Sequence, residues 1–413
     1  MEALRPASPT GPLSTSKISN AVTVTIAQPT SPTGDDPLRV SREKLYQHDP
    51  LMRLFRSGKN PLNEYAIVLA MGVLTVAVLF GGGYLFSLYF HNGRLDIQYV
   101  LRSAIQSAVV FPWLIFLYLR MPGDIASLFN EIHDNGVIGE PLKKPKGPTD
   151  YAMFVTWLTN AVDKWWWMMA ALAFIVLYTI YRLVVVYLSP ANATPLGFEI
   201  INTLNNDIIM YCIVMTLARL LTALVYSNVL FRNFMFHLNI LHPDGAGGLG
   251  SIEDILWTSA GLLVAMGIAG LVMNTSFLSG NFTPYSLGEA IIVGVLYLSL
   301  VPTLLFGWLF LPHKVMSDAH DETLQPLSNQ FQYTVDDDVP TQADDSTEIK
   351  HGTDRLDELK RRYDLIDKNF PVWPVQRFVR LLSTMSIPAA ITFVGSLPGI
   401  YNNVYAVVIR LFH

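Results

Sequence analysis

The chain has 413 residues, of which 51% are hydrophobic and only 15% are charged, and its formal net charge is -5. Soluble domains carry charge on roughly a quarter of their residues, so this composition predicts a multi-spanning membrane protein. The mild net charge implies neither nucleic acid nor an acidic substrate, and the single cysteine, Cys212, excludes an intramolecular disulfide and a thiolate metal site.

The first part of the chain is predicted to be a disordered tail. Residues 1–38 are rich in Ser, Thr and Pro, and they cannot bury enough apolar surface to offset the loss of chain entropy. They contain no apolar core of the signal-peptide type, so we expect the first membrane span to direct insertion. Three regions are expected to follow: a six-helix membrane bundle (39–311), a cytoplasmic helical extension with an acidic disordered break (312–372), and a seventh transmembrane helix with the C-terminus (373–413).

Seven apolar stretches are long enough to cross a membrane, since one crossing needs about 20 apolar residues. They cover residues 65–90, 99–119, 166–188, 208–231, 255–278, 287–311 and 381–400. The predicted fold class is therefore an all-α polytopic membrane protein with about seven transmembrane helices. Lys and Arg gather before the first stretch, after the second and after the sixth, whereas loops 189–206 and 279–286 have none. Because cytoplasmic loops retain Lys and Arg, the N-terminus is predicted to be cytoplasmic, and the plasma membrane is the expected location.

Two helices are predicted to continue beyond the membrane on the cytoplasmic side. The apolar pattern of the fourth stretch runs on to Leu241 and that of the sixth to Leu324, before a break rich in Asp over 336–345. A separate amphipathic helix is predicted over 353–370, with Thr353 as its N-cap. Its apolar stripe consists of Leu356, Leu359, Tyr363, Ile366 and Phe370. Since such a stripe needs a partner, we expect this helix to pack against the extensions in a cytoplasmic anchor bundle.

The loop between the fourth and fifth stretches combines a helix-breaking proline with several glycines. Its candidate residues are His242, Asp244, Gly245, Gly247 and Gly248. A structural explanation is sufficient, because Pro243 ends one helix, the glycines permit positive φ angles, and Asp244 or Ser251 can cap the next helix. A regulatory ligand is the alternative. A phosphate loop would need a lysine and a preceding strand, and one His with one Asp is too few for a metal.

Ionisable residues inside membrane spans are functional candidates by default, because burying charge in lipid is costly. Arg219 lies about 18 Å into the fourth helix, close to the membrane midplane. With Arg102, Arg182, Asp207 and Glu289 it forms the predicted polar pocket in the outer half of the bundle. The alternative for Arg219 is a structural ion pair that locks the bundle, and Arg102 and Arg182 can instead extend to the membrane surface.

The last apolar stretch carries a stripe of small and polar residues at helical spacing. Its members are Thr384, Pro388, Thr392, Gly395, Ser396, Gly399 and Asn403. Such a stripe suits either tight helix packing or the lining of a water-filled pore formed by several copies. The sequence leaves both interpretations open.

Two resemblances add further expectations. The loop His-Pro-Asp-Gly-Ala-Gly-Gly-Leu resembles a segment of multi-spanning prokaryotic proteins, a similarity that implies no activity. The seven spans, the cytoplasmic N-terminus and the 353–370 helix together resemble the architecture of insect odorant and gustatory receptors. That resemblance implies a homotetramer, a cation pore lined by the last helices, and a small-molecule ligand in the outer half of the bundle.

Three functions are weighed on these grounds. The first is a chemoreceptor-like ligand-gated ion channel, with membrane lipid, identical subunits, a small molecule and an inorganic cation as partners. The alternatives are a solute transporter that uses Arg219, and a non-conducting sensor. We expect no enzyme and no cofactor, because the spans contain no paired carboxylates, His cluster or activated nucleophile.

Overall fold

The computed structural model describes residues 36–56, 64–77, 108, 110–142, 147–188, 196–239, 242–273, 284–338 and 346–369. The chain divides into two units, Met1–Asp36 and Pro37–His413, and every element discussed below belongs to the second. The predicted last span and its stripe therefore lie outside the described residues, as does the tail over 1–35.

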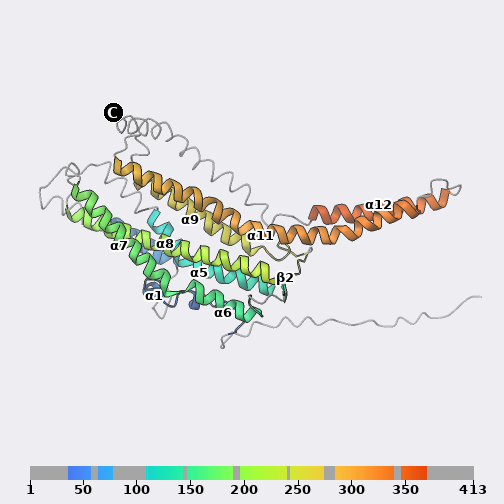
Figure 1. Ribbon diagram of the computed structural model, residues 1–413, viewed down its shortest axis with the longest axis horizontal. Helices are drawn as coiled ribbons and strands as arrows, with labels where there is room; N and C mark the ends of the chain where they lie inside the picture. Colours follow the sequence, from blue (N-terminus) through green and yellow to red (C-terminus); the bar gives the residue numbers. More distant parts are fainter. Residues whose placement is uncertain are drawn as a thin grey trace, which may run out of the picture. The chain divides into compact units, whose positions relative to one another are not determined.

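The described part is almost entirely helical (Figure 1). In chain order its elements are η1 (Glu43–Tyr46), α1 (Pro50–Arg56), α2 (Glu64–Ala77), α5 (Phe111–Asp134), β1 (Ile138–Pro141), α6 (Tyr151–Val162), α7 (Trp165–Leu188), α8 (Leu196–Asn233), β2 (Phe234–Phe236), α9 (Ser251–Met273), α11 (Pro284–Asp338) and α12 (Ser346–Asn369). This agrees with the predicted all-α class, apart from one short pair of strands.

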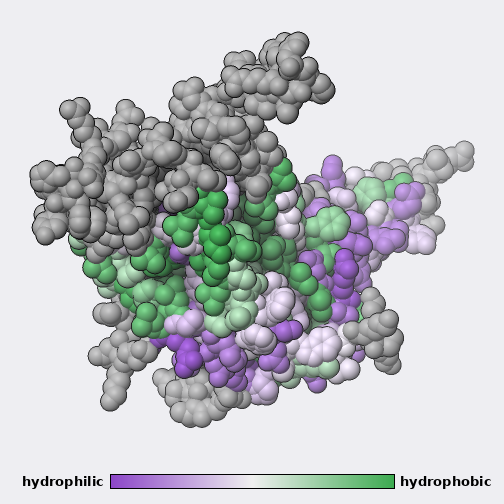
Figure 2. Space-filling model, turned by 60° about the vertical axis from the view of Figure 1, so that its left-hand side comes forward, coloured by the Kyte–Doolittle hydropathy of each residue, from purple (hydrophilic) through white to green (hydrophobic). Residues whose placement is uncertain are grey.

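Three helical stretches in the described part are long and apolar enough to cross a membrane. They are Tyr151–Tyr181, Thr203–Asn233 and Val295–Val335, and a shorter apolar helix covers Ala66–Ala77. Helix α7 is apolar on all sides and leaves large side chains exposed, among them Leu172, Leu177, Ile180 and Leu183. In Figure 2 the hydrophobic side chains form a broad band, and hydrophilic ones gather below it. An exposed apolar surface of this kind is typical of a helix that faces lipid.

Helix α5 lies at the centre of the buried core. Its apolar residues recur at three-and-four spacing, so one face buries Leu114, Tyr118, Ile125 and Phe129 while Arg120 stays outside. This helix packs against α2, α8 and α9, and α11 closes on α8 and α9. The helix was predicted to end near Leu119, but it continues to Asp134, so its buried face extends well beyond the predicted apolar stretch.

The prediction that the fourth helix continues to Leu241 was wrong. Helix α8 ends at Asn233, and Phe234–Phe236 forms strand β2, which pairs antiparallel with β1. The alternation of Phe234 and Phe236 has the period of a strand, and β1 supplies the hydrogen bonds that an isolated extended segment lacks. The unpredicted length of α8 lies at its other end, because it begins at Leu196 rather than near residue 208.

Helix α11 confirms the predicted extension of the sixth stretch. Its 55 residues correspond to about 82 Å at 1.5 Å per residue, far more than the roughly 30 Å of a bilayer core. The helix continues through the first part of the predicted acidic break, to Asp338. Helix α12 packs against it, as Figure 1 also shows, and begins at Ser346, so Thr353 is not an N-cap but lies two turns inside the helix.

An aromatic cluster joins α6 to the strand pair. The Phe154 ring lies 5.5 Å from Phe129, 6.3 Å from Phe234 and 5.7 Å from Tyr151, measured between ring centroids. Phe154 is fully buried. These contacts hold α6 against α5 and the end of α8, because each ring covers the others from solvent.

We predict that Phe154→Ala lowers the free energy of unfolding by about 3–5 kcal/mol, because it opens a cavity among the rings that pack against it. Thermal unfolding of the purified protein in detergent measures the loss as a lower midpoint. Phe174→Ala is the control, because this ring on α7 is 44% exposed and its removal leaves no closed cavity. Equal midpoints for the two variants would contradict the packing of this aromatic cluster.

Candidate functional site

The most polar group inside the bundle is the guanidinium of Arg219. Its side chain is only 1% exposed, although it lies in a stretch, Thr203–Asn233, that is apolar enough to cross a membrane. Residues three, four and seven positions away on α8 share its face, and Thr222, Ala223, Met215 and Cys212 are all buried. Arg219 therefore points into the protein core and not toward lipid.

Asp49, which lies 170 residues earlier in the chain, neutralises this guanidinium. The Arg219 Nη2 donates to Asp49 Oδ2 at 2.6 Å, and the Asp49 side chain is also 1% exposed. Asp49 directly precedes α1, and its Oδ1 accepts hydrogen bonds from the backbone N–H groups of Leu51 and Met52 at 3.1 and 3.3 Å. Aspartate followed by proline is a favourable helix start, since proline suits the first helical position. The Asp49 carboxylate thus caps α1 and also binds α8.

Two tyrosines complete the centre. The Tyr211 hydroxyl donates to Asp49 Oδ1 at 3.0 Å. The Arg219 Cζ lies 5.4 Å from the centroid of the Tyr118 ring, within the range of a cation–π contact. The two tyrosine rings pack edge to face at 6.2 Å. Within the described part, Arg219 Nε, Arg219 Nη1 and the Tyr118 hydroxyl have no hydrogen-bond partner. The centre is therefore closed to solvent and its two charges are paired, but among the described residues it lacks acceptors for the remaining N–H groups of Arg219.

The segment that supplies Asp49, residues 37–56, is here named the clamp segment. Its His48 binds Asp163 at the α6–α7 corner, through the backbone N–H at 3.1 Å and through Nδ1 at 2.7 Å. Its Val40 exchanges two hydrogen bonds with the Asn130 side chain of α5, at 2.8 and 3.1 Å. Leu45 and Met52 are fully buried beneath these polar contacts. The clamp segment thus connects α5, α8 and the α6–α7 corner.

Sequence reasoning missed this role, since residues 39–56 entered the prediction only as a basic flank. The Asp49-Pro50 pair followed by Leu51, Met52, Leu54 and Phe55 was the available signal, because it is typical of a capped amphipathic helix. No local pattern, however, indicates that Asp49 meets a residue 170 positions away.

Of the predicted outer pocket, the structure describes only the side chains of Asp207 and Arg219, and these two do not meet. Asp207 and Arg219 share helix α8, but twelve residues separate them by about 18 Å along its axis. Asp207 instead accepts a hydrogen bond from the Thr179 hydroxyl of α7 at 2.9 Å. Glu289 and Arg182 lie on α11 and α7, but their side chains are not among those that the structure describes, and Arg102 is outside the described residues.

The predicted anchor stripe lies on α12 as expected for the described residues. Leu356, Leu359 and Ile366 are half-buried, whereas Tyr363 is 39% exposed, and Phe370 is outside the described residues. Around Leu359, Arg355 and Arg362 of α12 share a cleft with Gln330, Tyr333 and Thr334 of α11. The pore residues Thr384, Pro388, Thr392, Gly395, Ser396, Gly399 and Asn403 all lie outside the described residues.

The glycine-rich loop folds around the carboxylate of Asp244. This group accepts hydrogen bonds from the backbone N–H groups of Ala246, Gly248 and Gly250 at 2.8, 3.0 and 2.9 Å, and His242 Nδ1 lies 2.8 Å away. Gly248 has a φ of 98°, and a Cβ there would overlap a methyl group of Val137. These contacts favour the structural explanation of the loop. In the described ranges no three His, Cys, Asp or Glu side chains converge on a metal-sized site.

Comparisons with protein-family models, with curated proteins and with solved structures found no match to this chain. The fold alone defines its class: a helical protein with three described helical stretches that are long and apolar enough to cross a membrane. Its function has to be inferred from its own residues.

We predict that Arg219→Met and Asp49→Asn each reduce stability by about 3–5 kcal/mol, since each change leaves the other group buried without its main partner. The double variant should recover much of this loss, because neither charge then remains. Thermal unfolding midpoints of the four proteins measure the coupling. Arg53→Met, an exposed change on α1, is the control and should shift stability by less than about 0.5 kcal/mol. Additive losses in the double variant would contradict a direct pair.

The Asp244 loop should lose stability in acid. Burial alone would raise the pKa of Asp244, but the hydrogen bonds from Ala246, Gly250, Gly248 and His242 outweigh it and lower the pKa below its ordinary value of 3.8. The stabilisation is therefore complete above pH 3.8 and is lost as the pH falls through the lower pKa of the folded state. Hydrogen exchange of residues 242–250 between pH 6 and pH 3 measures it. Asp244→Asn should remove this dependence, whereas Asp364→Asn, an exposed change on α12, should leave it intact.

Proposed function

We propose that the protein is a ligand-gated ion channel of the plasma membrane, assembled from several identical subunits and similar in plan to the chemoreceptor architecture. In this proposal the N-terminus is cytoplasmic, seven helices cross the membrane, and the last of them lines the pore. The proposal rests chiefly on one observation, the long pair formed by α11 and α12.

The α11–α12 pair leaves large apolar side chains uncovered. On α11, Phe331, Tyr333 and Val335 are 38%, 69% and 38% exposed, and on α12, Tyr363 and Leu365 are 39% and 53% exposed. Two helices can bury only the apolar residues on the faces that they turn toward each other. Lipid does not cover the remaining ones, because α12 is too rich in charged residues to lie in a membrane. A second copy of the same pair would cover these side chains, and closed rotational symmetry is the usual form of such assemblies.

This arrangement connects assembly to conduction through chain continuity. Helix α12 ends at Asn369, and the stripe from Thr384 to Asn403 follows in the sequence. If the α11–α12 pairs of neighbouring subunits associate around one axis, the segments that follow them enter the membrane close to that axis. A stripe of Thr, Ser, Gly and Asn on each copy would then suit a water-filled path for a cation.

The transporter alternative is disfavoured by the pairing of Arg219. An anionic solute would have to displace Asp49, whose carboxylate is also bound by Tyr211 and by two backbone N–H groups. In the described part of the chain, neither Asp49 nor Arg219 lines the pocket on α6 and α8 or the cleft between α11 and α12. Arg219 is better explained as a structural residue, and the ligand site of the proposed channel has to be sought elsewhere in the bundle. A non-conducting sensor would share the architecture, so only a measurement of ion flux separates it from a channel.

We predict that Thr392→Trp and Ser396→Trp abolish ion flux into proteoliposomes while the assembly remains intact, because an indole at the pore axis closes a narrow path. Leu397→Trp, on the opposite side of the same segment, is the matched control and should conduct. Mass photometry in nanodiscs measures the number of subunits, and Leu365→Glu on α12 should reduce that number by placing charge in the proposed interface.

Two outcomes would overturn this proposal. Monomeric wild-type particles would remove the central axis, and unchanged flux in both tryptophan variants would remove the pore. An intact oligomer without flux under any ligand tried, in wild type and variants alike, would favour the sensor.

A further inference from the structure

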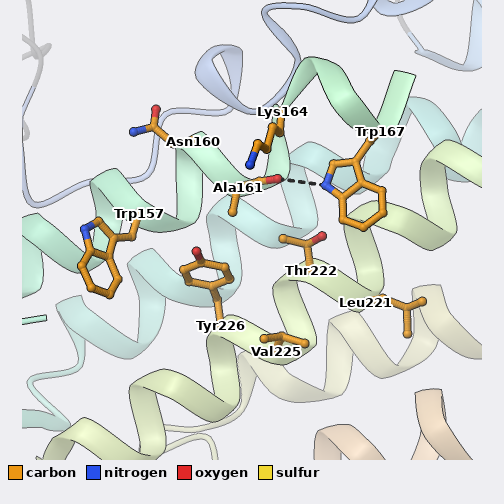
Figure 3. Close-up of a pocket in the computed structure, with 9 residues that line it drawn as sticks. All are labelled: Trp157, Asn160, Ala161, Lys164, Trp167, Leu221, Thr222, Val225 and Tyr226. Atoms are coloured by element: carbon orange, nitrogen blue, oxygen red, sulfur yellow. Dashed lines mark hydrogen bonds between the residues drawn. The ribbon is translucent and has the colours of Figure 1, made fainter. Parts of the chain in front are cut away.

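A groove of about 630 Å³ runs between α6 and α8 (Figure 3). Trp157, Asn160 and Lys164 line it from the α6 side, and Leu221 and Val225 form its floor on α8. Trp167, from the first turn of α7, closes one end, and its indole N–H donates to the backbone carbonyl of Ala161 at 3.1 Å. Its volume falls within the range of pockets that bind small molecules.

The chemistry of this groove has two distinct parts. Leu221, Val225 and the two indole walls are apolar, whereas the ammonium group of Lys164 and the amide of Asn160 stand along one edge. Thr222 and Tyr226 also line the α8 side, and the Thr222 hydroxyl donates to the backbone carbonyl of Ala218. Among the described residues, no acidic side chain lines the groove. Asp163, the neighbour of Lys164, is bound by His48, and within the described ranges Lys164 forms no ion pair. The groove therefore offers one uncompensated positive charge beside an apolar surface.

The position of the groove indicates where its occupant comes from. Trp165 and Trp166, 58% and 59% exposed, stand at the start of α7, and the exposed apolar side chains of that helix follow directly. Indole rings favour the headgroup level of a bilayer. Val225 on the groove floor is 57% exposed, so the groove is open on the surface that it shares with α7. Lys and Arg counts predict that this end of α7 faces the cytoplasmic leaflet, where anionic lipids concentrate.

We infer that the α6–α8 groove binds an anionic phospholipid of the cytoplasmic leaflet. The phosphate of the lipid pairs with Lys164 and accepts from Asn160, and one acyl chain lies along Leu221 and Val225 between the two indoles. A free phosphate ion has no apolar part that could contact Leu221 and Val225. A neutral or zwitterionic lipid would leave Lys164 without a partner of net negative charge.

The inference is independent of conduction, because it requires only that the protein lies in a membrane. It gives the α6–α7 corner a second function beside its bond to the clamp segment. A lipid in this groove touches α6, α7 and α8 together, so its binding stabilises the same junction that Asp163 and His48 hold. Lipid binding should consequently raise the thermal unfolding midpoint of the whole protein.

Native mass spectrometry of the full-length protein, released from detergent, tests the inference with phosphatidylglycerol, phosphatidylcholine and sodium phosphate as probes. We expect wild type to retain phosphatidylglycerol in preference to phosphatidylcholine. Lys164→Glu and Lys164→Gln should weaken phosphatidylglycerol binding, by about tenfold for the charge reversal, and leave phosphatidylcholine binding unchanged. Lys360→Glu, an exposed change on α12, is the matched control and should bind like wild type.

A second variant addresses the apolar part of the groove without altering charge. Val225→Trp should fill the floor and reduce phosphatidylglycerol retention, while its unfolding midpoint in phosphatidylcholine stays near that of wild type, because Val225 is exposed. The inference is overturned if Lys164→Glu and Lys164→Gln retain phosphatidylglycerol like wild type, or if phosphatidylcholine binds equally well. Displacement of the lipid by millimolar sodium phosphate would also overturn it, since the site would then be one for the free ion.

Discussion

A guanidinium without a counter-ion is too costly to keep inside an apolar bundle, so the packing of α5, α8 and the clamp segment depends on how Arg219 is neutralised. Asp49 supplies the opposite charge, Tyr211 binds the carboxylate, and Tyr118 covers the guanidinium. The pair does not have to add stability relative to an apolar core. It does restrict the bundle to the one arrangement in which both charges meet, and that arrangement fixes the clamp segment against three helices.

The helices that carry long apolar runs could be predicted from sequence because their signal is local. Helix α7 differs from its predicted start by one residue, and α11 was expected to run on past the membrane. The errors occur where the outcome depends on a distant partner. Phe234 and Phe236 form a strand because β1 supplies hydrogen-bond partners for them. Helix α5 continues beyond its apolar stretch because α9 packs against it.

The candidate site follows the same division between local and distant information. Burial of charge identified Arg219 as exceptional, and the structural ion pair was one of the two interpretations weighed. Its partner, however, belongs to a segment that composition marked only as basic. Asp207 and Arg219, both assigned to the predicted pocket, lie apart because helix geometry places residues twelve apart at different depths. The glycine-rich loop is the converse case, since proline, glycine and aspartate preferences alone account for its hydrogen bonds.

The long sequence separation of Asp49 and Arg219 has a consequence for biosynthesis. Asp49 leaves the ribosome 170 residues before its partner, which corresponds to on the order of ten to thirty seconds at usual rates of elongation. During that interval Asp49 has no arginine partner. Its carboxylate can be buried only after α8 has been made and has brought Arg219 into place. The burial of Asp49 is thus a late event in maturation, although this residue is among the first to be made.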